Sequence, residues 1–447
     1  MATVAAFVPR PRRVGVPTPA PAAVRVVGRA DGRVAAAARR LPRPPADAPR
    51  LVVVELGRDF RAADNGVLLR ALTVARARDA RAVLVHSGAG GGSLLAAAAM
   101  EADALEVAVV ELTPGDGGCD ATAVTAALGL ATRGRDGLEV AVDAGGAARE
   151  DRWERYCLPS GRPPVRGGVV VVTGGLGGLG LRVAHRLAHD LGAHPVLLDR
   201  QAPEGLADAG RARLLTLLGG PSGATVCRVD LAAPASVAAA LAPFAAAGVT
   251  GIVHCAGALV AGAVDTLTPE DLSRAQAAKV DGLRNVLAAV DQDRLRYLLT
   301  FGSITAAAPH RGLGAYALAN ELLARETLRY GRRLPACTTV AAQWSLWAGA
   351  GMSHDMGAVA QGRRMGMWPV PLGAGLETVV RLLSLPAGAH ALILAGGRSP
   401  LPDGTDRRSP RPEPAAVPSV QRAAARSSAG LPFQPGAVRA PRLRSSR

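Results

Sequence analysis

The sequence feature that most constrains the fold is a glycine-rich turn between a valine-rich segment and an amphipathic one. Gly168–Thr173 predicts a buried strand, and Leu179–Leu191 predicts a helix directly after the turn. The turn satisfies both the GxGxxG and the TGxxxGxG spacings, through Thr173, Gly174, Gly175, Leu176, Gly177, Gly178, Leu179 and Gly180. Such a turn lets a pyrophosphate approach the backbone N–H groups of a helix N-terminus. The sequence therefore predicts a dinucleotide site here.

Strands alternate with helices along most of the chain, which predicts an α/β protein with a parallel sheet. Residues 168–397 contain seven expected strands and indicate a Rossmann-type, doubly wound domain. Residues 50–150 show the same alternation, and we expect no glycine-rich phosphate loop in them. They are predicted to be a truncated Rossmann-like subdomain without a cofactor site, joined to the second domain by a linker over 151–167.

Positive charge is concentrated at the two ends of the chain. Residues 1–50 hold ten Arg and two Asp, and residues 401–447 hold nine Arg and three acids, out of a net charge of +16. Both ends are rich in Pro, Ala and Arg, so residues 1–49 and 398–447 are predicted to be disordered tails. Because little net charge is left between them, we expect no nucleic-acid partner.

The cysteines and the apolar segments point to an intracellular protein. The five cysteines are widely spaced, with no CxxC pair and no Cys/His cluster, so we expect reduced thiols and no metal site. We find neither a secretory segment nor a run of 18 apolar residues. The predicted location is the cytoplasm, with no membrane attachment.

A set of polar residues follows the turn in a pattern that suggests proton-transfer chemistry. Lys279 is the only lysine in a chain with 52 Lys and Arg residues. Ser303 ends an expected strand, and Tyr316 and Asn320 lie one turn apart on an expected helix. A nearby ammonium lowers the pKa of a phenol toward neutrality, and a hydroxyl can hydrogen-bond a substrate oxygen. We predict that these four residues are catalytic.

Two strand ends carry conflicting information about the cofactor. Asp199 would bind the ribose hydroxyls of NAD, whereas the adjacent Arg200 would bind the 2′-phosphate of NADP. Asp230 and Leu231 end the next strand, where the carboxylate could meet the adenine. A turn-capping role for Asp230 is an equally good interpretation.

Residues 50–397 resemble the ketoreductase domain of type I polyketide synthases, within the short-chain dehydrogenase/reductase superfamily. The matching motifs are Thr173–Gly180, His254-Cys255-Ala256-Gly257, Ala278-Lys279-Val280-Asp281-Gly282, Phe301-Gly302-Ser303, Tyr316–Asn320 and Trp344-Ser345-Leu346-Trp347. In this family the lysine comes from the helix before the tyrosine, and an asparagine takes the place it has elsewhere in the superfamily. Lys279 and Asn320 fit that exchange. The family also pairs its catalytic half with a truncated Rossmann-like half.

The resemblance implies a reaction, a cofactor and a partner. A β-ketoacyl thioester on the phosphopantetheine of an acyl carrier protein would be reduced with NADPH. Tyr316 would give the proton, Ser303 would orient the oxygen, Lys279 would acidify Tyr316, and Asn320 would support Lys279. Ala256 and Gly257 would join the cofactor site, residues 349–367 would form a substrate lid, and other synthase subunits could be partners.

Two departures from the family pattern leave alternatives open. Asp199 stands where relatives have a small residue, so NADH use remains possible. The two product-configuration markers are missing, because Leu259-Val260-Ala261 and Ala308 occupy their positions. The competing interpretations are a catalytically silent ketoreductase-like module of a split synthase, and a stand-alone dehydrogenase for small ketones.

Overall fold

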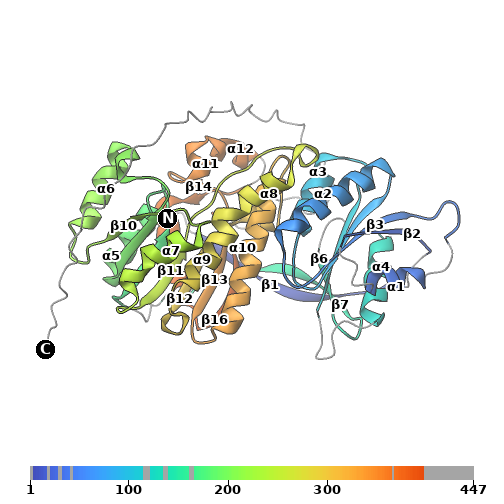
Figure 1. The fold of residues 1–447 in the computed structure, drawn as a ribbon, viewed down its shortest axis with the longest axis horizontal. Helices are drawn as coiled ribbons and strands as arrows, with labels where there is room; N and C mark the ends of the chain where they lie inside the picture. Colours follow the sequence, from blue (N-terminus) through green and yellow to red (C-terminus); the bar gives the residue numbers. More distant parts are fainter. Residues whose placement is uncertain are drawn as a thin grey trace. The chain divides into compact units, whose positions relative to one another are not determined.

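One large mixed sheet runs through the protein. The computed structural model describes residues 4–17, 21–28, 33–40, 44–113, 121–133, 139–160, 166–364 and 367–396. Fourteen strands pair in the order β10-β9-β8-β11-β12-β13-β16-β1-β7-β6-β5-β4-β3-β2. The sheet therefore passes without interruption from one Rossmann-type half to the other (Figure 1).

The C-terminal half has the predicted architecture. Its seven parallel strands are β8 (Val169–Thr173), β9 (His194–Asp199), β10 (Thr225–Arg228), β11 (Val249–His254), β12 (Tyr297–Ser303), β13 (Thr338–Trp344) and β16 (Gly388–Ala395). Its helices are α5 (Gly180–Leu191), α6 (Asp208–Leu218), α7 (Pro234–Leu241), α8 (Pro269–Gln276), α9 (Gly282–Ala288), α10 (Gly314–Arg333), α11 (Met352–Asp355), α12 (Ala358–Arg364) and α13 (Leu372–Leu382). The short strands β14 (Trp347–Ala348) and β15 (Val370–Pro371) pair separately. The expected doubly wound, parallel sheet is confirmed.

The N-terminal half repeats the pattern on a smaller scale. Its elements are β1 (Ala5–Val14), β2 (Ala23–Gly28), α1 (Arg33–Arg39), β3 (Arg50–Leu56), α2 (Ala62–Ala77), β4 (Arg81–His86), α3 (Gly92–Glu101), β5 (Val107–Leu112), α4 (Ala121–Arg133), β6 (Glu139–Val142) and β7 (Ala148–Tyr156). Strands β2 to β6 are parallel, and β7 returns antiparallel to β6.

The prediction of a disordered tail over residues 1–49 is wrong for the described part of that segment. Strand β1 lies between β16 and β7 and pairs with both in antiparallel fashion. Ala5, Ala6 and Phe7 are buried, and from Val8 onward β1 pairs with β7 alone. A strand with one unpaired side tolerates prolines such as Pro9 and Pro11, which composition had assigned to disorder. The expected C-terminal tail, 398–447, lies outside the described residues.

Two other expectations need correction. Residues 151–156 belong to β7 rather than to a linker, because their backbone pairs with β1. The N-terminal half also contains a glycine-rich turn: Ser87–Ser93 carries four glycines and connects β4 to α3. The turn follows β4, the fourth strand of its half, whereas a phosphate-binding turn is expected after the first strand of a Rossmann unit.

Helices of the two halves share one apolar core. Leu68 and Leu94 from the N-terminal half cluster with Leu272 and Leu318 from the C-terminal half, and all four are fully buried. Helix α10 packs against α3 and α8 as well as against β12 and β13. The helix predicted to carry Tyr316 and Asn320 therefore lies at the junction of the halves (Figure 1).

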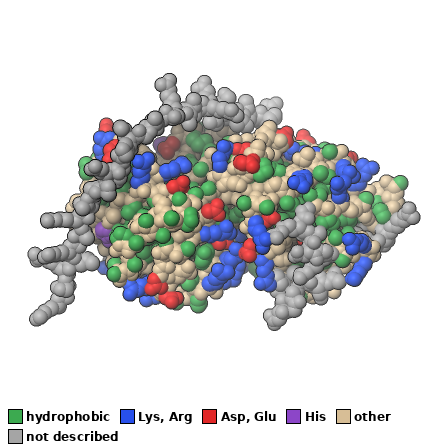
Figure 2. Space-filling view, in the orientation of Figure 1, with side chains coloured by type: hydrophobic (Ala, Val, Ile, Leu, Met, Phe, Trp, Pro, Cys, Tyr) green, Lys and Arg blue, Asp and Glu red, His purple; other side chains and the backbone are tan. Residues whose placement is uncertain are grey.

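Charged side chains of both signs are mixed on the visible surface of the molecule (Figure 2). On the face drawn in Figure 2, basic side chains lie among acidic and apolar ones rather than in one continuous field. Among the described residues, no helix has both the length and the apolar character needed to cross a membrane.

Candidate active site

The glycine-rich turn after β8 is shaped so that side chains are excluded. A Cβ on Gly180 would lie 2.0 Å from the carbonyl oxygen of Gly174, and one on Gly175 would lie 2.8 Å from Leu197 Cβ. Gly174 adopts a φ of +61°, which favours glycine. The turn leads directly into α5, whose N-terminus carries partial positive charge. These residues fit the pyrophosphate of a dinucleotide.

Asp199 stabilises this turn. Its Oδ2 accepts a hydrogen bond from Leu176 N at 2.9 Å, and its Oδ1 accepts one from Gln201 N at 2.9 Å. The neighbouring Arg200 is exposed at the end of β9. The acid that would have indicated NAD is thus engaged by the backbone, while the guanidinium of Arg200 faces solvent.

Asp230 and Leu231, which follow β10, hydrogen-bond within the protein. Asp230 is exposed, and its Oδ1 accepts a hydrogen bond from Ala232 N at 3.0 Å, as expected for a turn-capping acid. Leu231 is buried, and its carbonyl accepts a hydrogen bond from Asn285 Nδ2 at 2.8 Å. Of the two interpretations of Asp230, the turn-capping one describes the contacts seen.

A chain of hydrogen bonds connects the turn to the segment that carries Lys279. Thr173 Oγ1 lies 2.8 Å from His254 Nδ1, and His254 Nε2 lies 2.9 Å from the carbonyl oxygen of Lys279. Because that carbonyl only accepts, Nε2 bears the proton and Nδ1 accepts from the threonine hydroxyl. Thr173 Oγ1 in turn accepts from Ala256 N at 3.2 Å. Burial and the nearby Lys279 ammonium lower the pKa of His254 to about 3, so the ring is neutral.

Lys279 lies in a π-helical segment, Ala277–Asp281, between α8 and α9. The residue is 2% exposed, and its ammonium donates a hydrogen bond to the carbonyl oxygen of Phe301 at 3.0 Å. A Cβ on Gly257 would lie 2.7 Å from Lys279 Cε, so this glycine makes room for the side chain. Burial lowers the pKa of Lys279 to about 8. Single-turn π segments frequently occur at functional sites.

Lys279, Tyr316, Ser303 and Asn320 lie together, as the sequence predicted. The Lys279 ammonium is 5.9 Å from the centre of the Tyr316 ring. Burial raises the pKa of the Tyr316 phenol, and hydrogen bonds with the Asn320 and Ser303 side chains oppose this rise. Burial therefore outweighs the other influences on Tyr316, and the expectation that Lys279 lowers the pKa of this phenol is not met.

Asn320 keeps one polar atom available. Its Nδ2 donates to the carbonyl oxygen of Tyr316 at 2.8 Å, whereas its buried Oδ1 has no hydrogen-bond partner among the described residues. A buried, unpaired acceptor can take a proton-bearing ligand atom or a water.

The expected lid contacts the glycine-rich turn. Residues 349–364 form α11 and α12, and a Cβ on Gly178 would lie 3.1 Å from the backbone nitrogen of Gly351. A Cβ on Gly351 would likewise lie 3.0 Å from Leu179. Met352, Met356 and Trp368 expose 40%, 54% and 52% of their surface. Gly351 of the expected lid therefore lies against the glycine-rich turn, and Met352 and Met356 expose apolar surface on the same segment.

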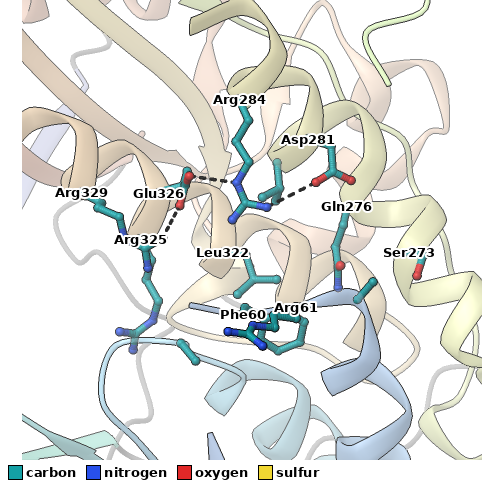
Figure 3. A pocket seen from close by; sticks show the side chains of 13 residues that line it. Phe60, Arg61, Ser273, Gln276, Asp281, Arg284, Leu322, Arg325, Glu326 and Arg329 are labelled. Atoms are coloured by element: carbon teal, nitrogen blue, oxygen red, sulfur yellow. Dashed lines mark hydrogen bonds and ion pairs between the residues drawn. The ribbon is translucent and has the colours of Figure 1, made fainter. Parts of the chain in front are cut away.

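A separate small pocket lies where the halves meet. Its volume is about 60 Å³. The N-terminal half contributes Phe60 and Arg61 to its lining, and the C-terminal half contributes Arg284, Arg325 and Glu326 (Figure 3). Arg284 donates to Glu326 at 2.9 Å. Because its charged lining is largely paired within the protein, we assign it no ligand.

Sequence reasoning missed the connecting roles of His254 and of the Phe301 carbonyl. In the sequence His254 stands out only as part of the His254–Gly257 motif, and a backbone carbonyl carries no sequence signal. A histidine directly at the end of a buried strand, before an Ala-Gly pair, was the one available indication.

Comparison with known proteins gives a consistent result. Residues 168–349 match the family model described as the KR domain. Polyketide synthase GfsA of Streptomyces halstedii is 38% identical over 193 residues, which are 41% of this chain and 2% of that protein. Pikromycin polyketide synthase component PikAIII of Streptomyces venezuelae is 31% identical over 231 residues, 50% of this chain and 14% of that protein. The chain thus spans only a small part of these relatives' length.

Solved structures show the same fold over both halves. A-type ketoreductases from a modular polyketide synthase align with a TM-score of 0.71 at 24% identity, covering 87% of this chain and 93% of that chain. The ketoreductase from the first module of phoslactomycin biosynthesis in Streptomyces sp. HK803 aligns with a TM-score of 0.70 at 24% identity and the same coverage. The aligned part extends well beyond residues 168–349.

Proposed function

We propose that this chain, whose residues 168–349 form a ketoreductase domain of the type found in type I polyketide synthases, reduces a β-ketoacyl thioester to the β-hydroxyacyl product with NADPH. The observation that carries the proposal is the buried Lys279 ammonium, which lies 5.9 Å from the centre of the Tyr316 ring. Both residues belong to a domain that begins with a glycine-rich turn of the dinucleotide-binding type. A buried lysine costs free energy, so its retention beside a phenol favours a chemical role.

The residues of the chain divide the reaction between them. Bound NADPH would supply the hydride. Ser303 would hydrogen-bond the ketone oxygen, and Tyr316 would donate a proton to that oxygen as negative charge develops there. Lys279 would stabilise the resulting phenolate, because its ammonium faces the ring and is held by the Phe301 carbonyl. After Tyr316 has given up its proton, the Oδ1 of Asn320 would accept a hydrogen bond from the water or from the Lys279 ammonium that reprotonates the phenolate.

The contacts of Asp199 favour NADPH over NADH. Both of its oxygens accept backbone hydrogen bonds at 2.9 Å, so the carboxylate is already used in shaping the turn. Arg200 is exposed beside it and can pair with a 2′-phosphate. The substrate would arrive on the phosphopantetheine of an acyl carrier protein, with the apolar lid side chains against the acyl chain.

The proposal is tested by NADPH oxidation with the purified full chain. β-Ketoacyl substrate is supplied both on a carrier protein and as a small thioester, with a small free ketone for comparison. Tyr316→Phe is expected to lower kcat by about 100-fold or more, since it removes the proton donor. The matched control is Tyr330→Phe on the same helix, whose hydroxyl lies at the far end of α10 and whose loss leaves activity unchanged.

The other outcomes separate the alternatives. Turnover of free ketones as fast as carrier-bound thioesters would identify a stand-alone dehydrogenase. Cofactor binding without turnover of any substrate would identify a silent module of a larger synthase. Failure to bind either NADPH or NADH would contradict the proposed enzyme altogether.

A further inference from the structure

The N-terminus of helix α3, in the N-terminal half, is held by a carboxylate from α10, the helix that carries Tyr316 and Asn320. Glu321, on α10, accepts hydrogen bonds from Gly91 N and Ser93 N at 2.9 Å each, and from Ser93 Oγ at 2.7 Å. Arg325 Nε also donates to Glu321, at 3.2 Å. Both carboxylate oxygens are therefore satisfied at the start of α3, in a site from which solvent is almost excluded.

The C-terminal end of α3 contacts the C-terminal half through a second carboxylate. Glu101, the last residue of α3, accepts hydrogen bonds from Gly312 N at 2.8 Å and from Val264 N at 2.6 Å. Gly312 lies four residues before Tyr316 in the chain. We call this pair of carboxylates, Glu101 and Glu321 with the backbone groups they accept from, the α3 clamp.

The Ser87–Ser93 turn has the geometry of an anion site, and Glu321 supplies the anion. Gly90 and Gly91 have φ values of +85° and +117°, which aim backbone N–H groups into one concavity. A Cβ on Gly90 would lie 2.8 Å from Glu321 Oε1 and 2.7 Å from Arg325 Cδ. The second glycine-rich turn of the protein is thus filled from within by a carboxylate rather than left open to a ligand.

The clamp fixes the chain on both sides of the candidate catalytic residues. Glu321 directly follows Asn320, and Gly312 precedes Tyr316. Between them, a Cβ on Gly314 would lie 3.1 Å from Leu94 and 3.5 Å from Ala97, so α10 begins in close contact with α3. Neither Glu101 nor Glu321 is among the four residues proposed to handle the proton.

We propose that Glu321 and Glu101 are positioning residues, which use the N-terminal half as a rigid support to set the rotation and the start of α10. This rests on the proposed reductase function for its kinetic readout. If α10 can turn about its axis, the Tyr316 hydroxyl leaves the position set by Ser303 and Lys279. Misplacement of a catalytic group by about 1 Å can cost on the order of 100-fold in rate.

The experiment is chemical rescue of Glu321→Ala by formate. The substitution removes the carboxylate and leaves its donors, Gly91 N, Ser93 N, Ser93 Oγ and Arg325, around an empty space of carboxylate size. We expect kcat to fall about tenfold or more with KM for NADPH within about twofold, and formate to restore most of kcat. Hydrogen exchange of residues 310–322 is measured on the same samples, and we expect protection to be lost and then restored by formate.

Three variants act as controls. Glu321→Gln fills the space and is expected to be impaired without rescue, because its amide NH2 faces N–H donors. Glu101→Gln is expected to lower kcat in the same way. Glu377→Gln, an exposed glutamate on α13, is expected to change nothing.

Each result bears on one of the two proposals. If the wild type reduces β-ketoacyl thioesters and Glu321→Ala matches it in kcat and exchange, the clamp is not a positioning device. A loss of kcat that follows the unfolded fraction, measured by circular dichroism, would also overturn the inference. If the wild type shows no turnover, the proposed function fails, and formate-dependent protection of residues 310–322 still decides the clamp.

Discussion

The two halves of this protein treat buried charge and glycine-rich turns in opposite ways. Arg325, at the junction with the N-terminal half, faces three carboxylates, those of Glu111, Glu139 and Glu321. Lys279, in the C-terminal half, has no acidic partner among the described residues and donates to a backbone carbonyl. Likewise, Glu321 fills the turn before α3 and accepts from its backbone N–H groups. The turn before α5 is braced by Asp199 through Leu176 N, and in the described part of the chain no carboxylate accepts a hydrogen bond from its glycines.

The difference shows what each half can contribute. Where α10 meets the N-terminal half, Arg325 is neutralised by Glu111 and Glu139 of that half and by Glu321 of its own helix, which stabilises a fixed junction. In the C-terminal half an ammonium is kept near its ionisation point, with a pKa of about 8, beside a turn that can take an anion. The same Rossmann-type architecture has therefore become a support in one half and a candidate active site in the other.

The largest effect is expected from removing the charge of Arg325. Arg325→Met leaves Glu111 and Glu139 without its guanidinium. Breaking a fully buried ion pair from one side costs about 3–5 kcal/mol, and because these side chains are partly exposed we expect a loss of about 2–3 kcal/mol. Urea unfolding at neutral pH measures this loss. Arg70→Met, an exposed arginine on α2, is the control and should change stability little. An equal effect of the two variants would show that the Arg325 network does not stabilise the fold.

The second effect concerns the open turn. Gly180→Ala introduces a Cβ 2.0 Å from the carbonyl oxygen of Gly174, so the turn must deform. We expect NADPH affinity to fall about 100-fold, equivalent to about 2.7 kcal/mol, as measured by fluorescence titration. Gly373→Ala on α13 has open space around its Cβ and should bind NADPH normally. Unchanged NADPH affinity in Gly180→Ala would show that the cofactor does not bind at this turn.

The third prediction has the opposite sign from that for Arg325. Because the pKa of Lys279 is about 8 in the folded protein and near 10.5 when unfolded, the unfolded chain binds more protons between these values. Lys279→Met should therefore abolish reduction while raising stability at neutral pH by about 1–3 kcal/mol. The gain should shrink as pH rises from about 8 to 10.5, as followed by urea midpoints. A loss of stability would make Lys279 a structural residue like Arg325.

The smallest effect is expected at Asp199. If this carboxylate only braces the turn, Asp199→Asn should lower stability by about 1 kcal/mol and leave the NADPH-to-NADH preference within about threefold. The ratio of kcat/KM for the two cofactors measures this. Arg200→Ala, as the companion variant, should reduce the preference for NADPH about tenfold or more. A large change in the NADPH-to-NADH preference of Asp199→Asn would show that Asp199 binds the cofactor ribose.

The candidate site was more predictable than the N-terminal half. Lys279, Ser303, Tyr316 and Asn320 were found because each is a chemically specific residue placed by a strand end or a helix repeat. The seven strands of the C-terminal half were found because their apolar runs are long and bounded by turns. Strand β1 was missed because its prolines and arginines suit a strand that pairs fully on one side only.

The sequence by itself determined the α/β class, the dinucleotide turn and the four candidate catalytic residues, because these depend on local periodicity and on residue chemistry. Only the tertiary structure decided that β1 joins the two halves, that Asp199 braces its turn, and that Glu321 fills the second one. Each of these depends on which groups from distant parts of the chain are left to satisfy a buried hydrogen bond, and residue type alone does not specify that partner.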